Sequence, residues 1–158
     1  MSLEELDDGS DIGCMILPMV ESNLLLPTVT VAEMAPIQPF DIKPNTPDWF
    51  LGYYPWRNLR VPVLSYETLN NQCSPKLNAD GRVAILNSTG VDESLPFISF
   101  LSQSLPRSLR LTQADIENNE AQPAREFEML SVNVHGEALL VPDLEKIEKA
   151  ILALNLRL

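Results

Sequence analysis

Two apolar segments joined by a two-residue polar turn constrain this chain more than any other feature. Residues 50–56 and 59–64 are rich in Tyr, Trp and Val, and they flank the dipeptide Arg57-Asn58. These residue types favour a pleated, half-buried surface, and Asn enters the left-handed backbone region at low cost. The pattern predicts a β-hairpin with Asn58 at a positive φ in its turn. Ser65 then offers a hydroxyl to cap a short following helix.

The same plan recurs 78 positions later without a gap. Residues 128–134 alternate apolar and polar side chains, as a strand with one buried face does. His135-Gly136 stands where Arg57-Asn58 stood, so both turns contain a residue that tolerates a positive φ. Asp143 takes the place of Ser65 as the helix cap. The chain is therefore expected to contain two related halves, each built on a hairpin.

These motifs resemble a known family. Asp-Trp-Phe-Leu-Gly at residues 48–52, Trp-Arg before the turn, and Val-Pro-Val-Leu-Ser at residues 61–65 resemble the signature of the CheW-like domain, the adaptor module of bacterial chemosensory systems. Residues 24–34 are similar to the family's Leu-Pro segment, which precedes a Val-rich stretch and a Glu. The resemblance is good over about residues 16–69 and diffuse over residues 82–147. It is strongest to the ChpC-type proteins, which are stand-alone adaptors of systems that govern type IV pilus motility.

The resemblance implies an all-β fold of two small, related five-stranded SH3-like barrels packed on a shared core. The residues by themselves predict only the duplicated hairpins and a C-terminal helix. We expect an acidic flexible tail over residues 1–11, followed by a single CheW-like domain over residues 12–158. Within it, lobe one would cover about residues 12–69 and lobe two about residues 82–158, with residues 70–81 as the linker.

The charge of the chain excludes several classes of partner. A net charge of −11 and a pI near 4.4 argue against DNA, RNA or anionic membrane, because these select basic surfaces. The acidic start has no Lys or Arg through Asp11, unlike a signal peptide, and no apolar stretch is long enough to span or insert into a membrane. Two cysteines without a disulfide framework fit a reducing compartment. We therefore expect a cytoplasmic protein.

Three further segments bear on the fold. Residues 98–111 are apolar but contain Pro106, and they fit a strand or a helix equally well. Residues 115–128 read as an acidic, mobile loop. Asp143 is expected to cap a C-terminal helix that docks internally or on a partner, with an apolar stripe of Leu144, Ile147, Ile151, Leu154 and Leu158.

Little in the sequence suggests catalysis. The only histidine, His135, lies in a predicted turn, and no nucleophile motif surrounds Cys14 or Cys73. A Cys/His hydrolase stays open as the weaker alternative. One histidine and two distant cysteines do not make a metal site, and no Gly-rich phosphate loop occurs. We expect no enzyme activity, no metal and no cofactor.

An aromatic group around the first hairpin contains the candidate binding residues. Strand alternation places about half of the rings inside, so core is expected for Phe50, Tyr54 and one tryptophan. Trp49 and Trp56 would otherwise suit a small carbohydrate- or peptide-binding module. An arginine beside a tryptophan is typical of protein interfaces. The candidate partner-binding residues are Trp49, Leu51, Trp56, Arg57 and Asn58.

The function implied by the resemblance is that of a non-enzymatic adaptor. It would couple the cytoplasmic tips of chemoreceptors to the regulatory domain of a CheA-type histidine kinase, in a system that controls type IV pili. One lobe would contact the kinase, and the groove between the lobes would receive receptor helices. The hairpin arginine of the family lies near the region that faces these partners, and Arg57 matches it.

Overall fold

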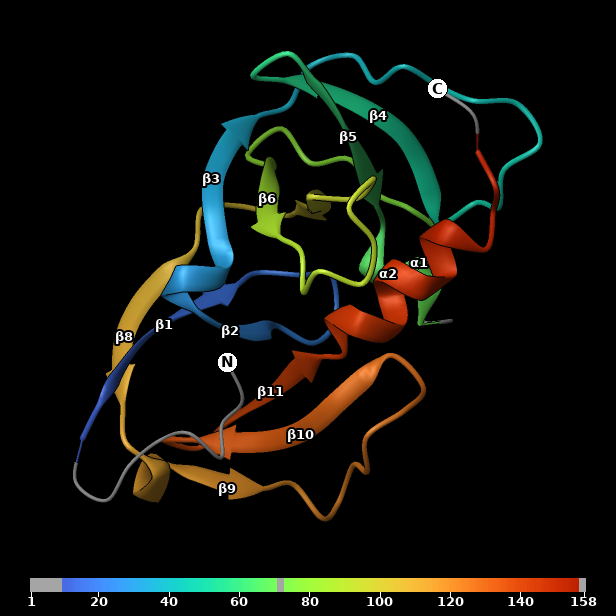
Figure 1. Cartoon of the computed structure of the whole chain (residues 1–158). Helices are drawn as coiled ribbons and strands as arrows, with labels where there is room; N and C mark the ends of the chain where they lie inside the picture. Colours follow the sequence, from blue (N-terminus) through green and yellow to red (C-terminus); the bar gives the residue numbers. More distant parts are fainter. Residues whose placement is uncertain (1–9, 71–72, 157–158) are drawn as a thin grey trace.

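The computed structural model describes residues 10–70 and 73–156 (Figure 1). Within these residues it contains eleven strands, two α-helices and two 3-10 turns. In chain order these are β1 (Ile12–Leu17), β2 (Leu24–Pro27), η2 (Thr28–Thr30), β3 (Val31–Pro36), β4 (Phe50–Trp56), β5 (Leu59–Leu64), α1 (Tyr66–Leu69), β6 (Arg82–Asn87), β7 (Phe97–Ser102), β8 (Arg107–Leu111), η3 (Gln113–Asp115), β9 (Ile116–Asn118), β10 (Glu128–Val134), β11 (Glu137–Pro142) and α2 (Leu144–Leu152).

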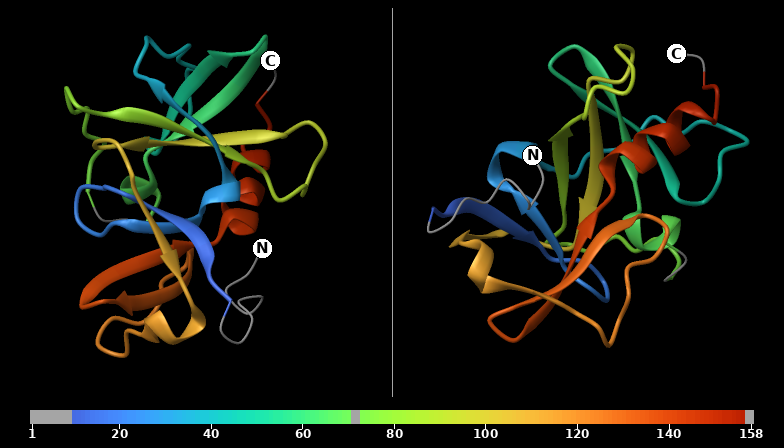
Figure 2. Two further views of the ribbon diagram at one scale, coloured as in Figure 1. Left: turned by 90° about the vertical axis from the view of Figure 1, so that its left-hand side faces the viewer. Right: turned by 60° about the horizontal axis from the view of Figure 1, so that its bottom comes forward.

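The strands form two curled sheets (Figures 1 and 2). Sheet A has six strands in the order β8-β1-β2-β11-β10-β9, and sheet B has five in the order β3-β6-β7-β5-β4. The expected all-β fold with a C-terminal helix is confirmed. Sheet A exceeds the expected five strands by β9, which lies inside the stretch 115–128 that was expected to be loop throughout.

The two sheets do not follow the two halves of the chain. Strands β1 and β2 pair with β8 and β11 from the second half, and β3 pairs with β6. The boundary expected at residues 70–81 therefore does not separate the sheets, and residues 12–69 do not form one lobe. The reason is that β1 and β2 of the first half join the second hairpin in sheet A, and β6 and β7 of the second half join the first hairpin in sheet B. Residues 1–9 of the expected tail and residues 71–72 of the expected linker lie outside the described residues.

The repeat at an offset of 78 residues is confirmed in the pairing of the strands. In the first hairpin the register shifts between Phe50 and Gly52, where Phe50 faces Leu64 and Gly52 faces Val63. In the second hairpin the shift falls between Glu128 and Leu130, which face Pro142 and Val141. Each of the four positions in the second hairpin is 78 residues after its counterpart in the first. The two hairpins therefore share their bulge as well as their turn.

Both hairpin turns have positive φ at their two central residues. The φ values are 48° and 62° at Arg57 and Asn58, and 49° and 82° at His135 and Gly136. Two consecutive positive values define the type I′ turn, whose twist matches that of the flanking strands. Sequence reasoning identified the second position of each turn but not the first. Arg has no preference for this region, and His, although enriched there, is a weaker signal than the Gly beside it.

The predicted helix caps are also present. The Ser65 hydroxyl accepts a hydrogen bond from the Thr68 amide at 3.3 Å, and it begins α1. The Asp143 carboxylate accepts one from the Lys146 amide at 3.1 Å, and it begins α2. Each helix thus follows directly after the second strand of its hairpin, β5 or β11.

The apolar side chains form three separate clusters. One fills the inside of sheet A and another the inside of sheet B. The third, which we call the shared core, joins the two sheets and both helices; it includes Leu24 and Leu140 from sheet A and Leu86 and Phe100 from sheet B. Strands such as β2 and β6 are buried on both faces, which explains their uninterrupted apolar sequences.

The ambiguous segment 98–111 contains two strands rather than one strand or one helix. β7 and β8 belong to different sheets, and the chain passes from one sheet to the other around Pro106. The apolar pattern was continuous because both strands face a core. No single period could fit it, since the two strands are not collinear.

Helix α2 docks internally in the described residues. Ile147 and Ile151 are buried in the shared core, and Leu144 and Leu154 pack against it. In the ribbon views, α2 lies between the two sheets (Figures 1 and 2). Leu158, the last residue of the expected stripe, lies outside the described residues.

Substitutions at Asn58 test the turn. Because its φ is 62°, Asn58→Gly is expected to be neutral or slightly stabilising. Asn58→Val should lower the free energy of unfolding by about 1–2 kcal/mol, because a β-branched side chain collides with the backbone there. Urea denaturation measures both values. Equal stability of the two variants would contradict the type I′ turn.

A substitution at Ile147 tests the docking of α2. Its side chain is 0% exposed, so Ile147→Ala should lower the free energy of unfolding by about 2–5 kcal/mol. Lys149→Ala, on the exposed side of the same helix, removes only an i,i+4 pair with Glu145 and should cost about 0.5 kcal/mol or less. A similar effect of the two variants in thermal or urea unfolding would show that α2 is not docked.

Candidate functional site

Arg57 is an exposed candidate residue whose side chain makes defined contacts. It lies at the tip of the β4–β5 hairpin, and 68% of its side chain is exposed. The centre of its guanidinium lies 4.4 Å from the centroid of the Trp56 ring. One guanidinium nitrogen lies 3.4 Å from a carboxylate oxygen of Glu33 on β3. A planar cation held on an aromatic face keeps its other donors free for a second protein.

Trp56 supports this arginine from below. The ring is only 7% exposed and packs edge-to-face against Phe97, with 4.8 Å between centroids. Its indole N–H donates to the second oxygen of Glu33 at 3.2 Å. Glu33 thus holds the ring and the guanidinium together. Glu33 occupies the Glu position in the segment that resembles the family, which was the one signal for it in the sequence.

The same contacts close sheet B. Its two edge strands, β3 and β4, are not paired with each other, but Trp56 reaches Glu33 and the Tyr54 hydroxyl donates to the Pro36 carbonyl at 2.8 Å. Burial, and then the charge of Glu33, raise the pKa of Tyr54, so this hydroxyl stays a donor. The β4 side of the hairpin is therefore anchored to β3.

The other candidate residues do not all gather at the tip. Asn58 is exposed in the turn beside Arg57, whereas Trp49 and Leu51 lie at the other end of β4. Since a strand rises about 3.3 Å per residue, that end is roughly 20 Å from Trp56. Trp49 packs half-buried against the shared core, and Leu51 against the inside of sheet B. Neither contributes to a common surface with Arg57.

This placement argues against the carbohydrate-binding alternative. A sugar platform needs accessible aromatic faces close together. Trp56 is buried and its outer face is covered by Arg57, while Trp49 lies at the opposite end of the strand. The two tryptophans therefore cannot stack on one sugar chain as a pair.

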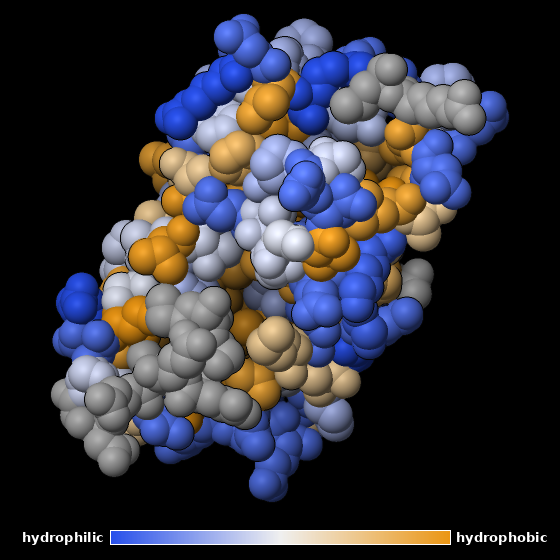
Figure 3. All heavy atoms as spheres, in the orientation of Figure 1, coloured by the Kyte–Doolittle hydropathy of each residue, from blue (hydrophilic) through white to orange (hydrophobic). Residues whose placement is uncertain are grey.

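A second surface of interest is a groove between the sheets. This inter-sheet groove has a volume of about 510 Å³ and combines residues of sheet A with the end of β6, η2 and the start of α2. Its two most exposed apolar side chains are Val29, at 68%, and Met129, at 49%. In Figure 3, hydrophobic residues are interspersed with hydrophilic ones over the face seen in Figure 1. The groove is lined by Leu26, Pro27, Val29, Thr30, Asn87, Ser88, Thr89, Met129, Val141, Pro142, Leu144 and Glu145.

Sequence reasoning did not identify the residues of this groove. Val29 and Met129 are about a hundred positions apart, and each alone looks like an ordinary apolar residue of a strand or turn. They meet only because η2 follows β2, and β10 lies two strands away from β2 in sheet A. The expectation of a groove came from the family resemblance alone.

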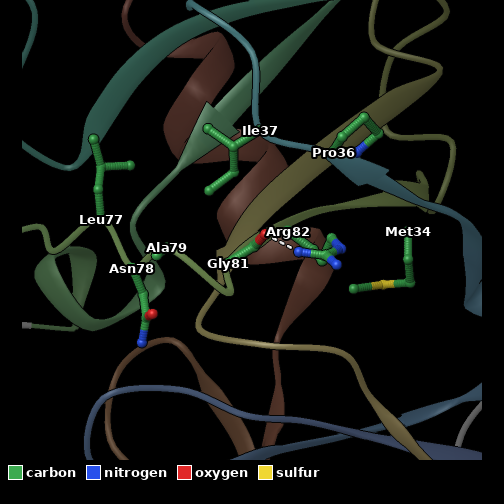
Figure 4. A pocket seen from close by; sticks show the side chains of 8 residues that line it. All are labelled: Met34, Pro36, Ile37, Leu77, Asn78, Ala79, Gly81 and Arg82. Atoms are coloured by element: carbon green, nitrogen blue, oxygen red, sulfur yellow. Dashed lines mark hydrogen bonds between the residues drawn. The ribbon is translucent and has the colours of Figure 1, made fainter.

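A larger hollow, of about 580 Å³, lies beside β3 and the residues before β6 (Figure 4). Its walls include Met34, Ile37 and the exposed Leu77. Arg82 is its only charged lining residue, and this side chain donates to the backbone carbonyls of Asp80 and Gly81. With the guanidinium turned to its own backbone, the hollow presents few polar groups to a ligand.

The geometry also argues against a Cys/His hydrolase. His135 pairs with Asp115, 3.3 Å away, and not with a thiol. Cys14 is buried inside sheet A, and burial raises the pKa of its thiol. Burial and then the nearby carboxylates of Glu67 and Glu21 also raise the pKa of Cys73. Both shifts disfavour the thiolate that a nucleophile needs.

Within residues 10–70 and 73–156, no group of three or more His, Cys, Asp or Glu side chains could hold a metal ion. In this part of the chain no helix is long and apolar enough to cross a membrane.

Comparison with known proteins gives the relationship of the whole chain. The crystal structure of the scaffolding protein TtCheW from Thermoanaerobacter tengcongensis is similar, with a TM-score of 0.72, 14% identity, and 87% of each chain covered. That identity is low, so the likeness concerns the fold. The search of curated proteins found no similar sequence. The model of the CheW-like domain, however, matches residues 14–151. The chain therefore belongs to the CheW-like domain family.

Proposed function

We propose that this protein is a non-enzymatic cytoplasmic adaptor that couples chemoreceptors to a CheA-type histidine kinase. Family membership supports a scaffold role in chemosensory signalling. The observation that carries the proposal is the arginine held in place at the hairpin tip. Arg57 stacks on Trp56 beside Glu33, and most of its side chain is exposed. The tip contacts the regulatory domain of the kinase. The inter-sheet groove binds the cytoplasmic tip of the receptor.

The hairpin tip suits a polar contact of high specificity. The guanidinium is held by a ring and a carboxylate, so less conformational entropy is lost when it binds. Its ion pair with Glu33 is exposed and contributes little to folding, which leaves the arginine available to exchange partners. Arginine is among the residues that most often dominate binding energy at protein interfaces.

The inter-sheet groove suits an apolar partner segment. Its floor is formed by aliphatic side chains, and Met129 can change its shape to fit a partner because its side chain is unbranched. An amphipathic helix presents side chains of this kind along one face. The receptor tip, which is helical in the family, supplies that face.

The finer assignment, to ChpC-type adaptors of type IV pilus systems, rests on the motifs around residues 48–65. Capture experiments in which the adaptor is offered kinase regulatory domains from pilus and from flagellar systems of the same cell would test it. Preference for the pilus kinase is expected. Equal capture of both domains would leave a general chemotaxis adaptor as the function.

Charge reversal at Arg57 tests the kinase contact. Arg57→Glu should weaken binding of the kinase regulatory domain by about a hundredfold or more, because reversed interface charges cost several kcal/mol. The free energy of unfolding should fall by about 1 kcal/mol or less, since only an exposed stacking contact and ion pair are lost. Calorimetric titration and urea denaturation measure the two quantities.

Arg110→Glu is the matched control for that experiment. Arg110 is also exposed and also pairs with one carboxylate, that of Asp11, but it lies on β8 of sheet A. The two variants change the net charge equally. Comparable losses of kinase binding in both would point to overall charge and refute a specific role of Arg57.

Val29→Lys tests the receptor contact. The residue is 68% exposed in the groove, so the substitution should hardly affect folding. A lysine there would bury a charge under a bound apolar segment, and we expect the affinity for a receptor-tip fragment to fall about tenfold or more. Kinase binding should be unchanged. Leu77→Lys, equally exposed but outside the groove, is the control; equal effects of the two would refute the groove.

A further inference from the structure

Glu148 is a fully buried carboxylate in the middle of α2. Both of its oxygens accept from the Thr89 amide at 3.0 Å, and one also accepts from the Thr89 hydroxyl at 3.1 Å. Thr89 lies in the segment between β6 and β7, so a residue of the C-terminal helix is tied to sheet B. Among the described residues, no ion pair is found for Glu148, and all its hydrogen bonds come from this one threonine.

Burying a carboxylate is costly unless hydrogen bonds replace its water. An apolar side chain at this position would pack in the shared core without that cost, as Ile147 and Ile151 do on either side. The carboxylate therefore adds what apolar packing does not supply, a fixed direction and distance between α2 and Thr89.

The segment that Glu148 holds is a wall of the inter-sheet groove. Asn87, Ser88 and Thr89 all line the groove, whereas Glu148 itself does not. The same segment is held on its other side, because the Asn87 side-chain amide donates to the Val29 carbonyl at 3.1 Å. The two opposite margins of the groove, η2 and α2, are thus fastened to one three-residue segment.

We propose that Glu148 is a positioning residue for ligand binding in the inter-sheet groove. By fixing Thr89 against α2 it sets the width of the groove before the partner arrives, so that an apolar helical segment binds without reordering the wall. This inference rests on the proposed function, since the ligand is the receptor-tip helix. It adds that the groove is preformed by a residue that never touches the ligand.

Two substitutions of graded effect test this proposal. Glu148→Gln retains one acceptor oxygen for Thr89, and Glu148→Leu retains none while nearly keeping the volume. The affinity for a receptor-tip fragment should fall about threefold in the first and about tenfold or more in the second. Binding of the kinase regulatory domain at the hairpin tip should stay within twofold. If the Leu variant does not fold, the Gln variant decides the outcome.

Ile151→Val is the control for loss of stability alone, since Ile151 is buried on the same helix and lies outside the groove. All proteins are compared at a temperature where each is folded. Unchanged receptor affinity in the Glu148 variants would overturn the proposal. So would a loss that Ile151→Val reproduces, or a parallel loss of kinase binding, because either would show a general structural effect.

Amide hydrogen exchange provides a readout that needs no partner. The Thr89 amide should exchange about tenfold faster in Glu148→Leu than in the parent. The Gln103 amide, which donates to the Pro18 carbonyl elsewhere, should not change. Unchanged exchange at Thr89 would overturn the inference in any case. If the parent binds no receptor fragment while Thr89 exchange responds as expected, the proposed function of the groove fails and the positioning of Thr89 by Glu148 stands.

Discussion

The shared core between the sheets is the constraint on which the rest of the structure depends. Strands β2 and β6 are apolar along their whole buried length, so both of their faces must be covered. One face is covered inside each sheet, and the other only by the opposite sheet and the two helices. Either sheet alone would expose a large apolar surface to water. The protein is therefore one cooperative unit, although its architecture is a repeat.

Buried carboxylates add direction to this apolar contact. Hydrophobic association fixes no particular angle between two surfaces, whereas a hydrogen bond does. Three carboxylates at the margins of the shared core accept bonds from segments that belong to the other sheet or lead out of it. These pairs are Glu67 with the Val20 amide, Glu128 with the Asn70 side chain, and Glu148 with Thr89. The relative orientation of the sheets, and with it the shape of the groove, follows from these polar contacts.

Local features of the fold were predictable from the sequence, and long-range ones were not. The hairpins, the caps at Ser65 and Asp143 and the offset of 78 residues follow from neighbouring residues alone. The division of the strands between the two sheets does not, because no local pattern in residues 12–27 or 82–102 specifies which hairpin they join. For the candidate site, Arg57 was predicted from its neighbours, but alternation could not tell that Trp56 is the tryptophan buried beneath it. The groove requires residues from distant segments, so no local pattern marks it.

The parallel pairing of β2 with β11 has a consequence for how the chain is made. Leu24 faces Leu140, so β2 finds this neighbour only when nearly all of the domain has been synthesised. Sheet B, by contrast, is complete once residue 102 has left the ribosome. On the nascent chain one edge of the apolar strand β2 therefore stays unpaired. Such an edge is a target for chaperones or for pairing with another chain. The order of synthesis makes sheet B the natural nucleus of folding, and the closing of sheet A the slow final step.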